Sequence, residues 1–76
     1  MYAVEVITRW IETDGYRQAE AVATYPGAWT DATGQPDANI MPDPNAVVWH
    51  GVVDAVTLDA LEADANVIVL WSENLG

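Results

Sequence analysis

The chain contains no lysine, and its only basic side chains are Arg9 and Arg17. Against them stand 12 aspartate and glutamate residues, so the 76-residue chain has a formal net charge of −10 at pH 7. Proteins that hold nucleic-acid phosphates or anionic lipid head groups need clustered lysine and arginine. The composition therefore excludes direct nucleic-acid binding and electrostatic attachment to a membrane.

Cysteine is absent as well, so neither a disulfide framework nor a thiolate metal site is expected. Apolar residues make up 51% of the chain, yet no uninterrupted apolar run approaches the roughly 20 residues of a membrane-spanning helix. An alternating pattern starts at Tyr2 and is typical of a strand rather than of a signal peptide. We expect one domain over residues 1–76 and no membrane segment.

The excess of carboxylates has three interpretations. It is typical of a solvated, self-repelling surface that keeps a small domain in solution. It also suits a salty medium, where charges are screened over about 3 Å at molar salt, and this would explain the complete lack of lysine. Imitation of a nucleic-acid backbone is the third, because carboxylates can complement a basic groove. The carboxylates are scattered singly along the chain, which weighs against imitation.

Alternation over residues 2–11 predicts a strand, because successive side chains of a strand point to opposite faces. The face expected in the core carries Tyr2, Val4, Val6, Thr8 and Trp10. The opposite face mixes charged with apolar side chains, among them Glu5, Ile7, Arg9 and Ile11. A turn at Asp14 and Gly15 predicts a second hairpin strand over 16–24, although 18–23 is also acceptable helix material.

All four prolines fall between residues 25 and 45, which excludes a long regular element there. We expect an ordered, functional Pro-rich loop, since Trp29, Ile40 and Met41 offer apolar anchors that a solvated linker lacks.

Residues 46–53 predict a strand, with Val47, Trp49 and Val53 on one face and Val48, His50 and Val52 on the other. A short helix should follow, capped by Asp54 or alternatively by Thr57. Its buried stripe is expected to consist of Leu58, Leu61 and Ala65, opposite the exposed Asp59 and Glu62.

The apolar run over residues 67–71 predicts a central strand, flanked on both sides. A right-handed crossover should place 46–53 and 67–71 parallel in one sheet. The predicted fold class is α+β: a small four-stranded mixed sheet, β-β-loop-β-α-β, with one short helix on one face.

Catalytic signatures are weak. His50 is the only histidine, and no sequence spacing places a carboxylate or nucleophile beside it. A histidine in an apolar strand is more often a structural or interface residue. Asp37, Asn39, Asp43 and Asn45 supply oxygen atoms but lack the glycine and terminal glutamate of a calcium loop. We therefore expect no enzyme activity, no cofactor and no metal site.

One short helix cannot cover both faces of such a sheet, so the other face should pack against the loop, a second copy or a partner. The residues expected at this interface are Ile7, Ile11, Trp29, Val48, Trp49, Val52 and Trp71.

Short motifs between residues 25 and 73 carry a family resemblance: Tyr25-Pro26-Gly27, Trp29-Thr30-Asp31, Gly34-Gln35-Pro36, Pro44-Asn45-Ala46, Leu58, Leu61-Glu62-Ala63-Asp64 and Val69-Leu70-Trp71-Ser72. Together they resemble small uncharacterised proteins encoded among the structural genes of tailed viruses of prokaryotes. The resemblance implies a minor virion subunit, either a capsid decoration or a tail accessory. The lack of lysine departs from that pattern and points to a saline host.

These observations predict a non-enzymatic protein-binding subunit of a virion, found in the host cytoplasm during assembly. Its partners should be capsid or tail subunits or further copies of itself. The alternative is an acidic, virus-encoded inhibitor that imitates nucleic acid to block a host defence nuclease.

Overall fold

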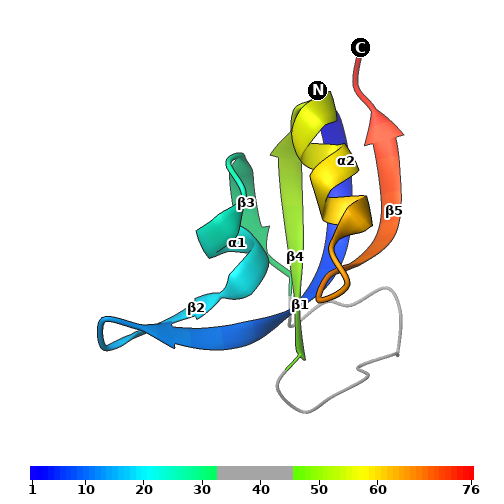
Figure 1. Cartoon of the computed structure of the whole chain (residues 1–76). Coiled ribbons are helices and arrows are strands. Elements are labelled where there is room, and N and C mark those ends of the chain that lie inside the picture. The colour runs from blue at the N-terminus through cyan, green and yellow to red at the C-terminus, as the bar shows by residue number, and fades with distance from the viewer. Residues whose placement is uncertain (33–45) are drawn as a thin grey trace.

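The computed structural model describes residues 1–32 and 46–76 (Figure 1). Within them the chain forms strands and helices in the order β1 (Tyr2–Thr13), β2 (Tyr16–Ala19), α1 (Glu20–Thr24), β3 (Ala28–Asp31), β4 (Ala46–Val53), α2 (Ala55–Ala63) and β5 (Ile68–Asn74). The predicted α+β class is confirmed.

The long strand β1 is the centre of the sheet. Its first half pairs with β4 on one side and with β5 on the other, β3 pairs with the outer side of β4, and β2 pairs with the far end of β1. The strands β4 and β5 run in the same direction, as predicted, but β1 lies between them. Every neighbouring pair among the described residues is therefore antiparallel, and the sheet has five strands where a four-stranded mixed sheet was expected. Residues 67–71 were expected to form a central strand, and this was wrong, because among the described residues β5 pairs with β1 alone.

The predicted hairpin is present. Asp14 and Gly15 have φ of 52° and 82°, the left-handed pair that a two-residue hairpin turn requires. The returning strand ends at Ala19, where the helical alternative takes over as α1. Ala19 provides no side-chain cap for this helix; instead, the backbone N–H of Ala21 donates to the Thr8 hydroxyl at 3.1 Å. A partner on β1 therefore supplies what the local sequence lacks.

The helix α2 covers one face of the sheet. Asp54 caps it by accepting from the backbone N–H of Thr57 at 2.8 Å, so Thr57 lies inside the helix and is not the cap. The core on this side, here called the helix-side core, consists of Val4, Val6, Ala21, Val53, Leu58, Leu61 and Val67. Leu58 and Leu61 are buried as predicted, whereas Ala65 is exposed because the helix ends at Ala63.

A second core lies on the opposite face of the sheet. It consists of Ile7, Ala32, Ala46 and Val48, with Leu70 packed against it. The sequence predicted that Ile7 and Val48 would form part of an interface, but both are buried within the chain itself. They face each other across β1 and β4, so each removes the other from solvent.

The predicted Pro-rich loop is described only in part. Residues 33–45, including the anchors Ile40 and Met41, lie outside the described residues. Before them, β3 pairs with β4 and places Trp29 opposite Gly51. A Cβ atom at Gly51 would lie 2.6 Å from the indole ring, so the bare backbone of β4 is what lets Trp29 pack this closely. Trp29 also donates its Nε1–H to the Tyr25 carbonyl at 3.1 Å.

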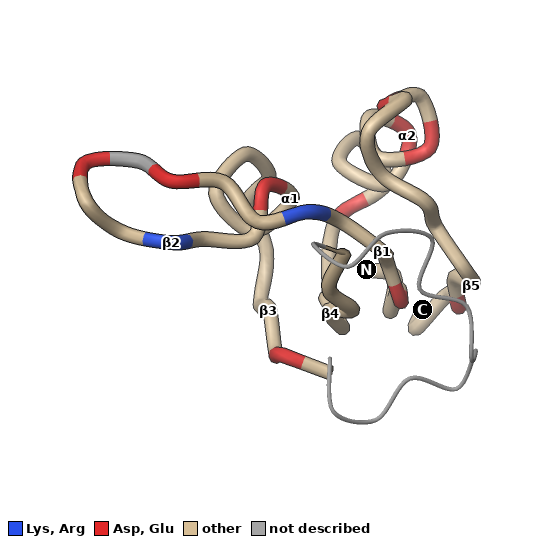
Figure 2. Tube along the Cα trace, turned by 90° about the horizontal axis from the view of Figure 1, so that it is seen from below, with Lys and Arg blue, Asp and Glu red and all other residues tan. Residues whose placement is uncertain are grey.

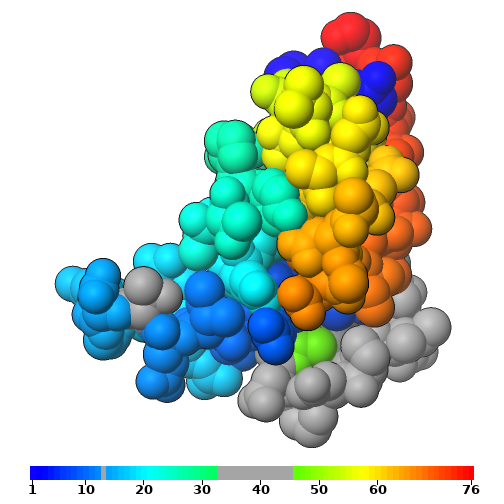
Figure 3. All heavy atoms as spheres, in the orientation of Figure 1, coloured from blue at the N-terminus to red at the C-terminus, as the bar shows by residue number. Residues whose placement is uncertain are grey.

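The described part of the chain is elongated, because the β1–β2 hairpin projects from the sheet as an arm (Figure 3). The two termini lie side by side at the opposite end, where the Leu75 N–H donates to the Met1 carbonyl at 2.9 Å (Figure 1). None of the helices in the described ranges is long and apolar enough to cross a membrane.

Candidate functional site

A carboxylate lies in the middle of the sheet. Glu5 is on the central strand β1, on the face away from α2, and its side chain is only 1% exposed. The register places His50 of β4 opposite it, and Glu5 Oε2 lies 2.6 Å from His50 Nε2. The histidine is 44% exposed. The pair therefore joins a buried acid to a group that solvent can reach.

A β-bulge brings Trp71 to the same place. The β1–β5 register shifts between Glu5 and Val6, where Val6 pairs with Val69 but Glu5 pairs with Trp71. Leu70 is the extra residue, and it turns Trp71 onto the face that carries Glu5. The ring centroids of Trp71 and His50 are 6.0 Å apart. Three strands thus contribute one side chain each to a Glu5–His50–Trp71 cluster.

The chemistry of this cluster is limited. A hollow of about 200 Å³ lies beside it, lined by Ala3, Val4, Ala28, Thr30, His50, Gly51, Val52 and Trp71. Thr30 is the one hydroxyl in this lining, and the β3–β4 register places it opposite His50. Within residues 1–32 and 46–76 no three His, Asp or Glu side chains gather as metal ligands.

The outer edge of β5 is the second notable feature. Among the described residues no strand pairs with this edge, so β5 can offer backbone N–H and C=O groups to another chain. Large apolar side chains lie along it: Ile68 is 47% exposed and Trp71 is 40% exposed. Such an edge is a template for an additional strand.

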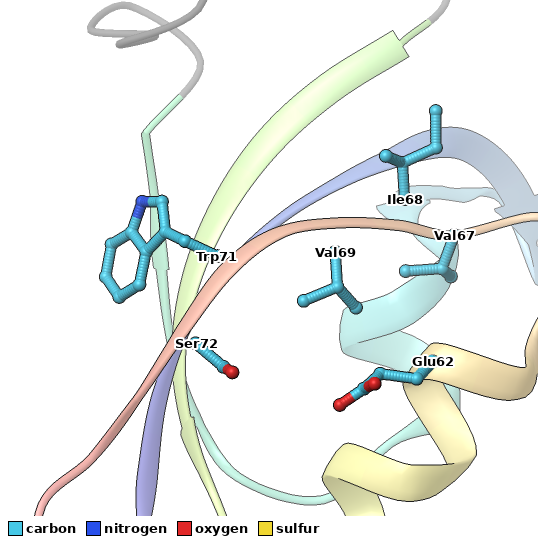
Figure 4. A pocket seen from close by; sticks show the side chains of 6 residues that line it. All are labelled: Glu62, Val67, Ile68, Val69, Trp71 and Ser72. Carbon is cyan, nitrogen blue, oxygen red and sulfur yellow. The ribbon is translucent and has the colours of Figure 1, made fainter.

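Beside this edge, α2 and β5 enclose a groove of about 450 Å³, lined by Glu62, Val67, Ile68, Val69, Trp71 and Ser72. Figure 4 shows Glu62, Val69 and Ser72 on the α2 side of β5, while Trp71 lies on the opposite side. The strand therefore presents two different faces along one edge. We refer to the groove and the outer edge of β5 together as the β5 surface.

A third hollow, of about 460 Å³, lies where the hairpin arm meets the sheet and is lined by Trp10, Arg17, Gln18, Ala19, Val22 and Trp49. The Arg17 guanidinium lies 5.1 Å from the centre of the Trp10 ring. The Trp49 indole N–H is buried and has no hydrogen-bond partner among the described residues. The Trp49 ring is half-buried and packs against the helix-side core.

The structure separates the predicted interface residues. Ile7 and Val48 are in the second core, whereas Ile11, Trp29, Trp49 and Val52 are half-buried. Only Trp71 belongs to the β5 surface. Sequence reasoning missed Glu5, Ile68 and Glu62. The alternation did place Glu5 on the same face as Ile7, but nothing in the sequence indicated that β4 would set His50 opposite it.

Comparisons with protein-family models, curated proteins and solved structures find no match to this chain.

Proposed function

We propose that the chain is a non-enzymatic protein-binding subunit whose β5 surface accepts a strand from a partner protein. The observation that carries the proposal is the edge of β5, which is unpaired among the described residues and carries exposed Ile68 and Trp71. Main-chain hydrogen bonds along such an edge provide affinity, and pockets for alternate side chains provide specificity.

The composition of β5 supports the proposal that its outer edge binds another strand. Proteins commonly protect free edges with charged side chains, especially lysine, with proline, or with a bulge that twists the edge away. The sequence of β5, IVLWSEN, contains neither lysine nor proline, and despite its bulge and the single charge of Glu73 it exposes Ile68 and Trp71. Tryptophan is frequent among the residues that dominate binding energy, so Trp71 is the natural anchor.

The proposed setting is a virion of a tailed virus, where the partner is a capsid or tail subunit. The motif resemblance over residues 25–73 supports this setting. Within the described part of the chain, the acidic residues are spread over the hairpin, both helices and the sheet without forming one continuous row (Figure 2). This distribution favours a binding subunit over an imitation of nucleic acid.

Mass spectrometry of purified virus particles tests the setting. Stoichiometric presence in the particle supports a structural subunit. Absence from the particle, together with a stable complex with a nuclease, would favour the inhibitor instead.

A double variant tests the surface. Ile68→Lys with Trp71→Lys places two charges on the β5 edge, where both side chains are already exposed, and should prevent particle association while leaving the circular dichroism spectrum native. Val56→Lys is the matched control, because Val56 is an exposed apolar residue of α2 outside the β5 surface. Equal loss of association in both variants would contradict the proposal.

A further inference from the structure

Among the described residues, one charged side chain lines the groove of the β5 surface, the acid Glu62, and no base lines it. Apart from His50, the basic side chains of the chain are those of Arg9 and Arg17. Both arginines lie on the hairpin strands (Figure 2). Arg9 is already bonded there to Glu20, with Nε and Oε2 2.6 Å apart. No cation of this chain therefore offsets Glu62 within the groove lining.

A strand added to β5 would point its side chains alternately to the two sides of the sheet. On the α2 side they would enter the groove, where the Glu62 carboxylate and the Ser72 hydroxyl accompany the apolar Val69 (Figure 4). On the opposite side they would meet the exposed ring of Trp71 and, two positions further along β5, the exposed Glu73. The two sides therefore select different side chains at successive positions.

We propose that the occupant of the β5 surface is a partner strand that is basic on one face and apolar on the other. Its lysine or arginine enters the groove and pairs with Glu62, and the adjacent apolar side chain packs on Trp71. This inference rests on the proposed function and specifies the chemistry of the partner. A chain of net charge −10 attracts a partner that carries positive charge.

The same charge argues against a second copy as the occupant. Two β5 edges paired with each other would bring another IVLWSEN strand, which contains Glu73 but no basic residue. Glu62 would remain without a counter-charge, and two molecules of net charge −10 would be brought together. A basic partner would supply the counter-charge for Glu62 and would not be repelled by the acidic chain.

The experiment uses the full chain and two synthetic peptides, in which valine alternates either with lysine or with glutamate. The lysine peptide should bind and slow hydrogen exchange at the backbone amides of β5, and the glutamate peptide should not bind. Glu62→Gln should weaken binding of the lysine peptide at least about threefold at low salt, since an exposed ion pair contributes modestly. This difference should shrink at about 1 M salt.

Glu12→Gln provides the matched control. It removes the same charge from the exposed hairpin arm, outside the β5 surface, and should change affinity less than about twofold. Equal effects of the two substitutions, equal binding of both peptides, no binding of either, or protection of amides outside β5 would each overturn the inference. Particle association that requires Ile68 and Trp71 but is insensitive to Glu62→Gln would retain the proposed function and reject only the basic partner. A dimer of the chain that Ile68→Lys dissociates would instead identify a second copy as the occupant.

Discussion

Glu5 is an acidic residue whose side chain is buried in the middle of the sheet. A carboxylate on the central strand, almost completely removed from solvent, is costly unless a partner compensates it. His50 is that partner, and it lies on the neighbouring strand at the paired position. The cost of Glu5 is therefore tied to the identity of residue 50.

The first prediction tests this dependence. His50→Val should reduce the free energy of unfolding by about 1–3 kcal/mol, because it leaves the Glu5 carboxylate without its imidazole partner. The double variant Glu5→Val with His50→Val should be more stable than His50→Val alone, since two valines form a favourable cross-strand pair. Urea denaturation measures both.

His50→Gln is the control for the first prediction, because its amide can still donate to Glu5 and should retain part of the stability. Additive losses in the double variant would show that the pair is not coupled.

The second prediction concerns Tyr25 and Asp64, which join the segment before β3 to the end of α2. The Tyr25 hydroxyl donates to Asp64 Oδ2 at 2.7 Å and holds the pKa of Asp64 below its ordinary value of 3.8, with further help from the Asn66 N–H. A lowered folded pKa stabilises the fold above pH 3.8, and this stability is lost as the pH falls through the folded pKa. Tyr25→Phe should therefore make the loss of stability on acidification shallower.

Urea midpoints measured from about pH 6 to about pH 3 give this slope. Tyr16→Phe is the control, because Tyr16 is exposed on the hairpin, and its removal should leave the slope unchanged. Carboxylates elsewhere contribute the same background to all variants, so the comparison isolates Asp64. Identical slopes in Tyr25→Phe and the native chain would count against the assignment.

The helix α2 covers one side of the sheet and contributes buried leucines to the helix-side core. Leu61 is fully buried in the helix-side core, whereas Val56 points to solvent from the same helix. The third prediction is that Leu61→Ala lowers the free energy of unfolding by about 2–4 kcal/mol because it leaves a cavity. Val56→Ala removes a comparable apolar side chain and should change it by less than about 0.5 kcal/mol. Thermal and urea unfolding measure both substitutions. If the two lowered the free energy of unfolding by similar amounts, the assignment of the buried face of α2 would be wrong.

The strands show where local patterns stop being sufficient. The alternation of residues 2–11 predicted correctly which β1 side chains face α2, because side-chain direction in a strand is a local property. Whether a strand is central in the sheet is not a local property, because it depends on which other strands pair with it. An apolar run such as that of β5 is typical of a strand covered on both sides, yet in this fold β1 takes the central place and leaves Ile68 and Trp71 exposed.

For the chain as a whole, charge is the dominant property. With a net charge of −10 on 76 residues, the folded state concentrates negative charge that the unfolded chain can spread out. The fourth prediction is that the melting temperature rises between about 0.05 M and about 1 M sodium chloride, as this repulsion is screened. A flat or falling melting temperature would contradict both the solubility and the salt-adaptation interpretations of the acidity.

The sequence alone was sufficient for the features that neighbouring residues decide. These are the hairpin turn at Asp14 and Gly15, the start of α2 at one of two candidate caps, its buried leucines and the alternation of β1. Each depends on backbone dihedrals or side-chain periodicity within a few residues.

Beyond the β1–β2 hairpin, only the tertiary structure decided which strands became neighbours. Pairing across distant positions set Glu5 opposite His50, and the bulge at Leu70 turned Trp71 toward them. The same pairing buried Ile7 and Val48 and left the outer edge of β5 free among the described residues. Strand order depends on contacts between residues far apart in the chain, so no local pattern could reveal that the candidate site lies at the β5 edge.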